Sequence, residues 1–210
     1  MSRLEFEDLP FYKRPDLSPY LIHLTKRTKN QDDCYSAFDN LVNILRTGEI
    51  WGSTSGSGFI KAASSASCFM DVPFSALKYI LNKDNADPQK PRYEPFGIVV
   101  TKKYAYSKGC RPVLYLSNKE LKALQLPKDE VWRVVRLEVN DDKWISWLHE
   151  REWRCKGDFL LPKKLLAVLV EDPSDALRLQ TILAEEQDDF VSVPKSIIPL
   201  RVICQGLPYL

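Results

Sequence analysis

The sequence is poor in histidine, which limits the chemistry it can carry. Only His23 and His149 occur among its 210 residues, so a histidine-based metal or acid–base site would need carboxylates and thiols as well. The five cysteines are spread along the chain without a close pair, which excludes the paired spacing of a zinc knuckle. An odd cysteine count without a signal peptide predicts a reducing compartment, and we expect a cytoplasmic protein.

The chain also lacks a long apolar run and a charge excess of one sign. No apolar segment reaches the ~18 residues of a membrane span, so we expect no membrane contact. Lysine and arginine total 30 against 28 acidic residues, a net charge of +2, which argues against a wholly basic nucleic-acid coat. Hydrophobic residues at 44% and the chain length predict one globular domain over residues 1–210, with 1–19 as an extended N-terminal arm and 20–210 as the body.

Apolar periodicity predicts short strands mixed with a few helices. Leucine, isoleucine and phenylalanine recur at helical spacing over 36–46, with Ser36 as a plausible N-cap and Gly48 as the C-terminal stop. Strands are expected over 20–25, 96–101, 112–116, 132–139, 165–170 and 197–204, and further helices over 75–81 and 175–186. The fold class that follows is α+β.

His23 and Thr25 form the first candidate ligand contact. They stand two apart on a predicted strand, so both side chains point to the same face. A glycine- and serine-rich loop over 52–58 follows the next helix, and such loops can approach phosphates closely. The plainer alternatives are a strand histidine bonded to a backbone carbonyl and a loop that is simply flexible.

Glu150 and Glu152 form the second candidate. On a strand both carboxylates would share one face, where they repel unless a cation, a metal or a proton lies between them. The alternative is a solvated edge strand with Glu–Arg ion pairs. Three tryptophans within ten residues argue against a simple solvated edge, because aromatic bulk lowers the local dielectric around a carboxylate.

Taken in order, these stretches resemble the ADP-ribosyltransferase superfamily, and most closely its poly(ADP-ribose) polymerase-like and DarT-type branches. The motifs are His23-x-Thr25, a helix ending in Ile44-Leu45-x-x-Gly48, the phrase Cys68-Phe69-Met70-Asp71 and a late Glu-aromatic strand. The stretch 68–74 and the Glu-Arg-Glu-Trp-Arg of 150–154 are also similar to bacterial abortive-infection proteins of the AbiGi type, a likeness that runs from residue 23 to about 170.

This resemblance implies a compact split-sheet fold that uses NAD as co-substrate. His23 would hydrogen-bond the adenosine-side ribose, with Thr25 as its companion on the strand. Phe69 stands where many relatives have an aromatic residue, and Tyr79 would stack on nicotinamide. Glu152, which precedes Trp153, would be the catalytic glutamate.

Glu150 would then be the first carboxylate of a Glu-x-Glu pair, which in some branches binds or activates the acceptor. The implied function is that of a bacterial toxin or phage-defence effector that transfers ADP-ribose to a nucleic acid or a protein, with an antitoxin as partner. Cleaving the nicotinamide–ribose bond passes through an oxocarbenium-like state, which a fixed carboxylate stabilises by about 3 kcal/mol. This chemistry needs no metal.

Two other classes of function remain open from the residues alone. A metal-dependent nuclease could use Glu150, Glu152 and an aspartate, with Lys102 or Lys103 near phosphate. A non-enzymatic sensor or antitoxin on the same fold could bind nucleic acid through arginines 133, 136, 151 and 154 around tryptophans 132, 147 and 153. Such arginines, however, commonly pair with carboxylates such as Glu138.

Overall fold

The computed structural model describes residues 14–30, 33–54, 65–82, 85, 91–141 and 143–207. Most of the predicted N-terminal arm, residues 1–13, lies outside this range, as does the second half of the glycine-rich loop. No helix in the described part of the chain is long and apolar enough to cross a membrane.

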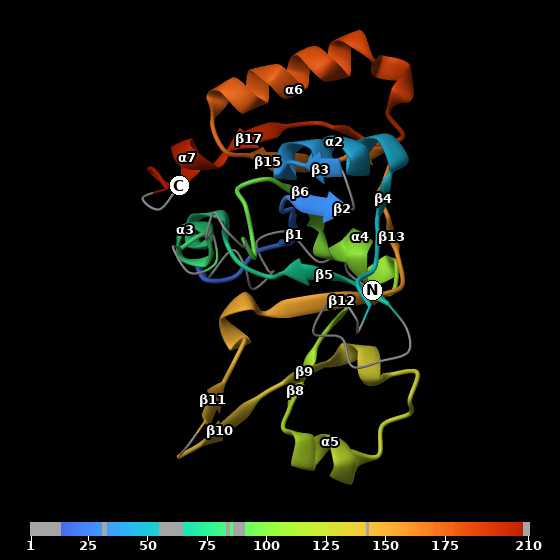
Figure 1. Ribbon diagram of the computed structural model, residues 1–210, viewed down its shortest axis with the longest axis vertical. Helices are drawn as coiled ribbons and strands as arrows, with labels where there is room; N and C mark the ends of the chain where they lie inside the picture. The colour runs from blue at the N-terminus through green and yellow to red at the C-terminus, as the bar shows by residue number, and fades with distance from the viewer. Residues whose placement is uncertain are drawn as a thin grey trace, which may run out of the picture.

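A seven-stranded sheet forms the centre of the molecule (Figure 1), in the order β17-β15-β6-β1-β5-β12-β7. All neighbours are antiparallel except β15 and β17, which are parallel. The strands are β1 (Tyr20–Leu24), β5 (Ala66–Met70), β6 (Gly97–Thr101), β7 (Arg111–Pro112), β12 (Glu152–Lys156), β15 (Ala167–Val170) and β17 (Ile197–Pro199).

The sheet is divided between β1 and β5. β1 pairs with β6 over five residue pairs, and β5 pairs with β12 over another five. In contrast, β1 and β5 are joined by the single pair Ile22↔Met70. We call this junction the seam. The mixed α+β class expected from the sequence is confirmed, and the sheet has two halves that meet at one residue pair.

Helices α2 (Ala37–Thr47) and α6 (Pro173–Glu185) cover one face of the sheet. Ser36 and Asp39 form a capping box at the start of α2, and Gly48 ends it at a φ of 70°. The inward side chains of α2 pack with the face of the sheet that carries Leu21 and Ile98. The predicted helix boundaries are confirmed within about two residues.

The other face carries shorter elements. A 3-10 turn over Phe74–Ala76 leads into α3 (Leu77–Ile80), and α7 (Leu200–Ile203) lies nearby. Their apolar residues pack with Ile22 and Met70. The two faces of the sheet therefore have separate cores, one under α2 and α6 and one under α3 and α7.

The segment 114–148, described except for residue 142, lies below β12 in Figure 1. We call it the lower lobe. It contains β8 (Leu114–Leu116) parallel to β9 (Val134–Arg136), helix α5 (Asn118–Leu124), and the hairpin of β10 (Glu138–Asn140) and β11 (Lys143–Ile145). None of the residues of α5 is buried, so this helix adds nothing to either core.

Small elements complete the described part of the chain. They are β2 (Thr28–Asn30), β3 (Asp33–Tyr35), β4 (Glu49–Ile50), α4 (Lys102–Ser107), β13 (Phe159–Leu160), β14 (Lys164–Leu165) and β16 (Val193–Pro194), with 3-10 turns at Val131–Arg133, Leu148–Glu150 and Gln187–Asp189.

Four strand predictions need correction. The expected strand 197–204 is wrong after Pro199, because Leu200 and Cys204 are buried four residues apart while Val202 is exposed, which is helical spacing. The expected strands 112–116, 132–139 and 165–170 are each broken into shorter strands that belong to different sheets.

Candidate functional site

His23 lies on β1 directly after the seam. Its Nδ1 is 2.9 Å from the carbonyl oxygen of Cys68 on β5, and its ring meets the Phe69 ring edge-on at 5.9 Å between centroids. This side-chain bond spans the two strands just beyond the point where their main-chain pairing stops. His23 therefore links the two halves of the sheet.

The protonation state of His23 follows from this contact. Burial lowers the pKa of His23, while the hydrogen bond to Cys68 opposes this effect, so the ring is neutral at pH 7. Because a carbonyl oxygen can only accept, Nδ1 carries the proton and donates it to Cys68. Nε2 is then left as an acceptor, suited to a hydroxyl group of a ligand.

Glu152 is the first residue of β12 and stands opposite Met70, which in turn stands opposite Ile22 across the seam. Its Oε1 accepts from Arg154 Nε at 2.7 Å, and its Oε2 accepts from Arg154 Nη2 at 3.3 Å. The amide of Glu152 donates to the Tyr115 hydroxyl at 3.1 Å. Both the main chain and the carboxylate of Glu152 are thus held by hydrogen bonds.

Cys68 lies between the two candidate residues. Its carbonyl oxygen receives the His23 bond, and its thiol donates to the carbonyl oxygen of Ala66 at 3.9 Å. Burial raises the pKa of Cys68, and the neighbouring negative charge of Glu152 raises it further. Cys68 is therefore a neutral thiol whose pKa depends on the nearby charge of Glu152, and β5 is the strand that lies between His23 on β1 and Glu152 on β12.

The side chains of His23 and Glu152 point to opposite faces of the sheet. His23 lies beside Phe69, whereas Glu152 lies with Cys68 and Met70, whose side chains point to the opposite face. A ligand that touches both His23 and Glu152 would have to cross the seam. The one-pair junction is the place where the sheet is least closed by main-chain bonds.

Two of the predicted cofactor contacts, Thr25 and Phe69, are buried close to His23. Thr25 is buried, and its hydroxyl is within hydrogen-bonding distance of the carbonyl oxygens of Ala37 and Phe96, at 2.9 and 3.2 Å. Phe69 is 1% exposed and packs on Phe159 with ring centroids 4.8 Å apart. Thr25 therefore fixes the chain just after β1, and Phe69 packs on the His23 ring from β5.

Tyr79, the fourth predicted contact, lies on α3 and is 69% exposed. Lys78 places its ammonium 5.2 Å from the centre of the Tyr79 ring. Helix α3 packs on the face of the sheet that carries Met70, and Glu152 stands opposite Met70 on that face. The ring is therefore free to contact a ligand without a rearrangement of the core.

Glu150 and Glu152 do not share a strand face, and that expectation is wrong. Glu150 ends a 3-10 turn, and Arg151 has a left-handed φ of 43° that redirects the chain before β12 begins. The two carboxylates consequently enter different surroundings, although only one residue separates them in the sequence.

Glu150 is buried and has partners of its own. It is 4% exposed, and its Oε1 accepts from the Tyr93 hydroxyl at 3.0 Å and pairs with Arg92 Nη2 at 3.2 Å. Burial raises the pKa of Glu150, although the charge of Arg92 acts against this shift. Arg92 also stacks on Trp147, with its guanidinium carbon 3.8 Å from the ring centre.

Two residues of the expected nucleic-acid stacking surface, Arg154 and Trp132, are buried. Arg154 is 2% exposed and bound to Glu152. Arg136 pairs with Glu138, as the plainer alternative predicted. The Glu-x-Arg spacing predicts the pair of Glu152 and Arg154, since residues two apart on a strand share a face. Nothing local could have linked Tyr115 to Glu152.

The metal-dependent alternative finds no support in the described residues. Among them, no group of three or more histidine, cysteine, aspartate or glutamate side chains is arranged to hold a metal ion. Glu150 and Glu152 each face an arginine, which occupies the oxygens that a metal would need.

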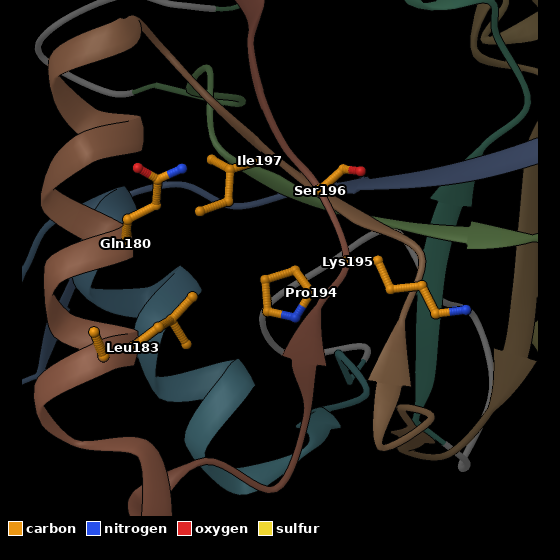
Figure 2. A pocket seen from close by; sticks show the side chains of 7 residues that line it. Gln180, Leu183, Pro194, Lys195, Ser196 and Ile197 are labelled. Carbon is orange, nitrogen blue, oxygen red and sulfur yellow. The ribbon is translucent and has the colours of Figure 1, made fainter.

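A cavity of about 490 Å³ lies elsewhere, between α6 and the segment that enters β17. Figure 2 shows Gln180 and Leu183 on the helix facing Pro194 and Ile197, with the Lys195 side chain extending away from the helix. Neither His23 nor Glu152 lines this cavity. No carboxylate, thiol or imidazole lines it, so the Ser196 hydroxyl and the Lys195 ammonium have no general base beside them among the lining residues.

No family model and no curated protein matches this chain. Two solved structures are similar to it. One is DarT of Thermus sp. 2.9 in complex with NAD+, at 16% identity and a TM-score of 0.49, and the other is the same protein in complex with carba-NAD+, at 15% identity and a TM-score of 0.47. Each match covers 87% of this chain and 96% of the DarT chain.

Proposed function

We propose that this protein is an NAD-dependent ADP-ribosyltransferase that binds NAD across the seam of its sheet. One observation carries the proposal: His23 and Glu152 both adjoin β5 at the seam, His23 through the carbonyl oxygen of Cys68 and Glu152 opposite Met70, the residue that pairs with Ile22. A neutral imidazole with a free acceptor and a fixed carboxylate therefore flank the same strand at the point where the sheet is divided.

The chemistry assigns a separate task to each group. Nε2 of His23 accepts a hydrogen bond from a ribose hydroxyl and orients the sugar. The bond between ribose and nicotinamide breaks, and nicotinamide leaves with the bonding electrons. Glu152 stabilises the positive charge that develops on the ribose, an effect worth about 3 kcal/mol for one preorganised group. A nucleophilic atom of the acceptor then bonds the same carbon and releases its proton to solvent.

The remaining predicted residues take supporting roles in this proposal. Tyr79 presents an exposed ring for nicotinamide, Thr25 anchors the chain just after the strand that carries His23, and Phe69 packs on the His23 ring. Glu150 is engaged by Arg92 and Tyr93, so we assign it to holding the turn before β12 and not to contact with the acceptor.

The test is release of nicotinamide from NAD by the purified protein. Glu152→Gln keeps the shape of the side chain and removes its charge, so we expect at least a 100-fold loss of rate. The matched control is Glu186→Gln, which removes a carboxylate that is also paired with an arginine, Arg46, away from the seam. Melting temperatures of both variants show whether each is folded. Equal rates for wild type and Glu152→Gln would refute the proposal.

A non-enzymatic binding module is the second candidate, and the Arg154 ion pair favours it. An arginine bound to both oxygens offsets the negative charge that would stabilise an oxocarbenium-like state. This candidate predicts that NAD raises the melting temperature of the wild type but is not consumed. Consumption of NAD excludes it.

The biological role and the acceptor form a further part of the proposal. We propose that the protein acts as a bacterial toxin or defence effector on a nucleic acid or a protein. Expression in bacteria should then arrest growth, and Glu152→Gln should relieve the arrest. Lysate treated with protein and NAD labelled in its adenosine half should carry the label in the nucleic-acid fraction or in the protein fraction, which identifies the acceptor class. Growth arrest that persists with Glu152→Gln would contradict this role.

A further inference from the structure

Arg154 is a buried arginine with an unusual set of partners. Its side chain is 2% exposed on β12. Nε and Nη2 donate to the two oxygens of Glu152, at 2.7 and 3.3 Å. Nη1 donates to the main-chain carbonyls of Trp132 and Val134, at 2.8 and 3.3 Å. All three nitrogens of the guanidinium are therefore engaged.

The two carbonyls fix the position of the arginine. Trp132 and Val134 belong to the 3-10 turn and the start of β9 in the lower lobe, and Trp132 is itself 4% exposed. Carbonyls of the main chain cannot rotate away as side chains do, so Nη1 is anchored from outside β12. The guanidinium is planar, and anchoring one end sets the direction of the two groups that face Glu152.

The charge of the arginine survives its burial. Burial by itself would lower the pKa of Arg154, but the ion pair and hydrogen bonds with Glu152 raise it, and the net shift is upward. An arginine is charged at every accessible pH in any case. The carboxylate of Glu152 thus always faces a cation in fixed orientation.

We propose that Arg154 is the positioning residue of the site, setting the orientation of the Glu152 carboxylate toward the seam from an anchor in the lower lobe. The inference rests on the proposed function, because orientation matters only if Glu152 acts on a bound substrate. A lysine could supply the charge but not the two parallel hydrogen bonds, since its ammonium is a single point donor on a flexible stem.

Arg154→Lys separates orientation from charge. We expect its kcat for nicotinamide release to fall 10- to 100-fold with the KM for NAD within about twofold of wild type, because small misplacements of a reacting group reduce the rate more than binding. The matched control is Arg46→Lys, an arginine–glutamate pair between α2 and the residue after α6, which should keep the wild-type kcat. Circular dichroism and melting temperature establish that each variant is folded.

The outcomes are distinguishable. No nicotinamide release by the wild type overturns the proposed function and this inference together. An active wild type with an equally active Arg154→Lys overturns the positioning role alone. Should Arg154→Lys not fold, Glu152→Asp withdraws the carboxylate by one methylene while Arg154 stays. We expect the same loss of kcat at unchanged KM, and a wild-type kcat in Glu152→Asp overturns the inference.

Discussion

Glu150 and Glu152 are neighbours in the sequence, yet each is bound by a different arginine from a different part of the chain. Arg92 binds Glu150, and Arg154 binds Glu152. The left-handed Arg151 between them turns the chain so that the two carboxylates part. A buried carboxylate that lost its arginine would be an uncompensated charge, which typically costs about 3–5 kcal/mol. Each pair therefore depends strongly on both of its members.

Glu150 makes the stability of the protein depend on pH. Because the pKa of Glu150 is raised by burial, the folded protein binds this proton at a higher pH than the unfolded chain. The free energy of unfolding then falls as the pH rises from about 4.3, the ordinary value for glutamate, through the raised pKa. Glu150→Gln, which cannot ionise, removes this contribution.

The prediction can be measured by urea unfolding of wild type and Glu150→Gln between pH 4 and 8. Relative to the variant, the wild type should lose stability with rising pH, by no more than about 1.4 kcal/mol per pH unit. Glu186→Gln, at a carboxylate that is 41% exposed, serves as the control. Parallel stability curves for wild type and Glu150→Gln would contradict the raised pKa.

At this scale the sequence indicated which residues are unusual but not how they face one another. His23, Glu150 and Glu152 were identified from their types and spacing. The positive φ of Arg151 has no sequence signal, because arginine is not a residue that favours this conformation. The partners Arg92 and Tyr115 come from distant segments, so only the folded chain shows them.

Elements with local stop signals were predictable, and those shaped by packing were not. Helix α2 has its capping box, its apolar stripe and its terminal glycine within one short stretch. Helix α5 begins with a similar capping box at Ser117 and Glu120, which is a local signal of the same kind. The segment after β17 becomes helical because of what it packs against, and its apolar residues alone resemble a strand.

Two constraints favour glycine at position 48, where α2 ends: a left-handed backbone and a close contact with a side chain. Alanine variants of Gly48 and Gly109 separate the two. Gly48 has a φ of 70°, and a Cβ there would lie 2.5 Å from Cγ1 of Val191. Gly109 also has a left-handed φ, of 91°, but a Cβ there would meet nothing within 4 Å. Gly109→Ala therefore carries only the backbone cost of about 1–2 kcal/mol, whereas Gly48→Ala adds overpacking of about 1–3 kcal/mol.

Chemical denaturation of the two alanine variants tests this difference. Gly48→Ala should lose about 1–3 kcal/mol more in free energy of unfolding than Gly109→Ala. If both variants lost the same amount, Val191 would have moved aside at no cost and the contact would not constrain the end of α2.

The whole molecule combines an upper part, which is the seven-stranded sheet with the helices packed on it, with a lower lobe that has few buried residues. The two hydrophobic clusters of the upper part contain most of the buried residues. In the lower lobe, Trp132, Val134 and Val135 are buried, while Leu124, Val139 and Trp144 are exposed. Segments with few buried apolar contacts open at lower free energy than the core does.

Hydrogen–deuterium exchange should show this difference in stability. We expect the amides of α5, β10 and β11 to exchange much faster than those of β1, β6 and β15. The intact protein is labelled, and exchange is then measured on its peptides by mass spectrometry. The amides of β9 should be intermediate, because Arg154 holds the carbonyl of Val134. Uniform protection across both parts would contradict a separate lower lobe.

The order of the strands could not be predicted from the sequence, because it depends on pairing between distant segments. β5 and β12 are adjacent in the sheet but about 80 residues apart in the chain, and no local pattern encodes that contact. The mixed fold class could be predicted, since the alternation of strands and helices is a local property. The site could be predicted only as a set of residues, and its geometry came from the fold.

The one-pair seam also affects how the sequence can vary. A full ladder between β1 and β5 would use the peptide groups on the facing edges of both strands, whereas the observed pairing involves one residue from each. Peptide groups are present whatever the side chains are, so recognition through them survives substitution at most positions. A fold that binds its ligand along such an edge can retain the binding mode while its sequence diverges almost completely, provided that the few side chains that act at the edge, such as His23, are retained.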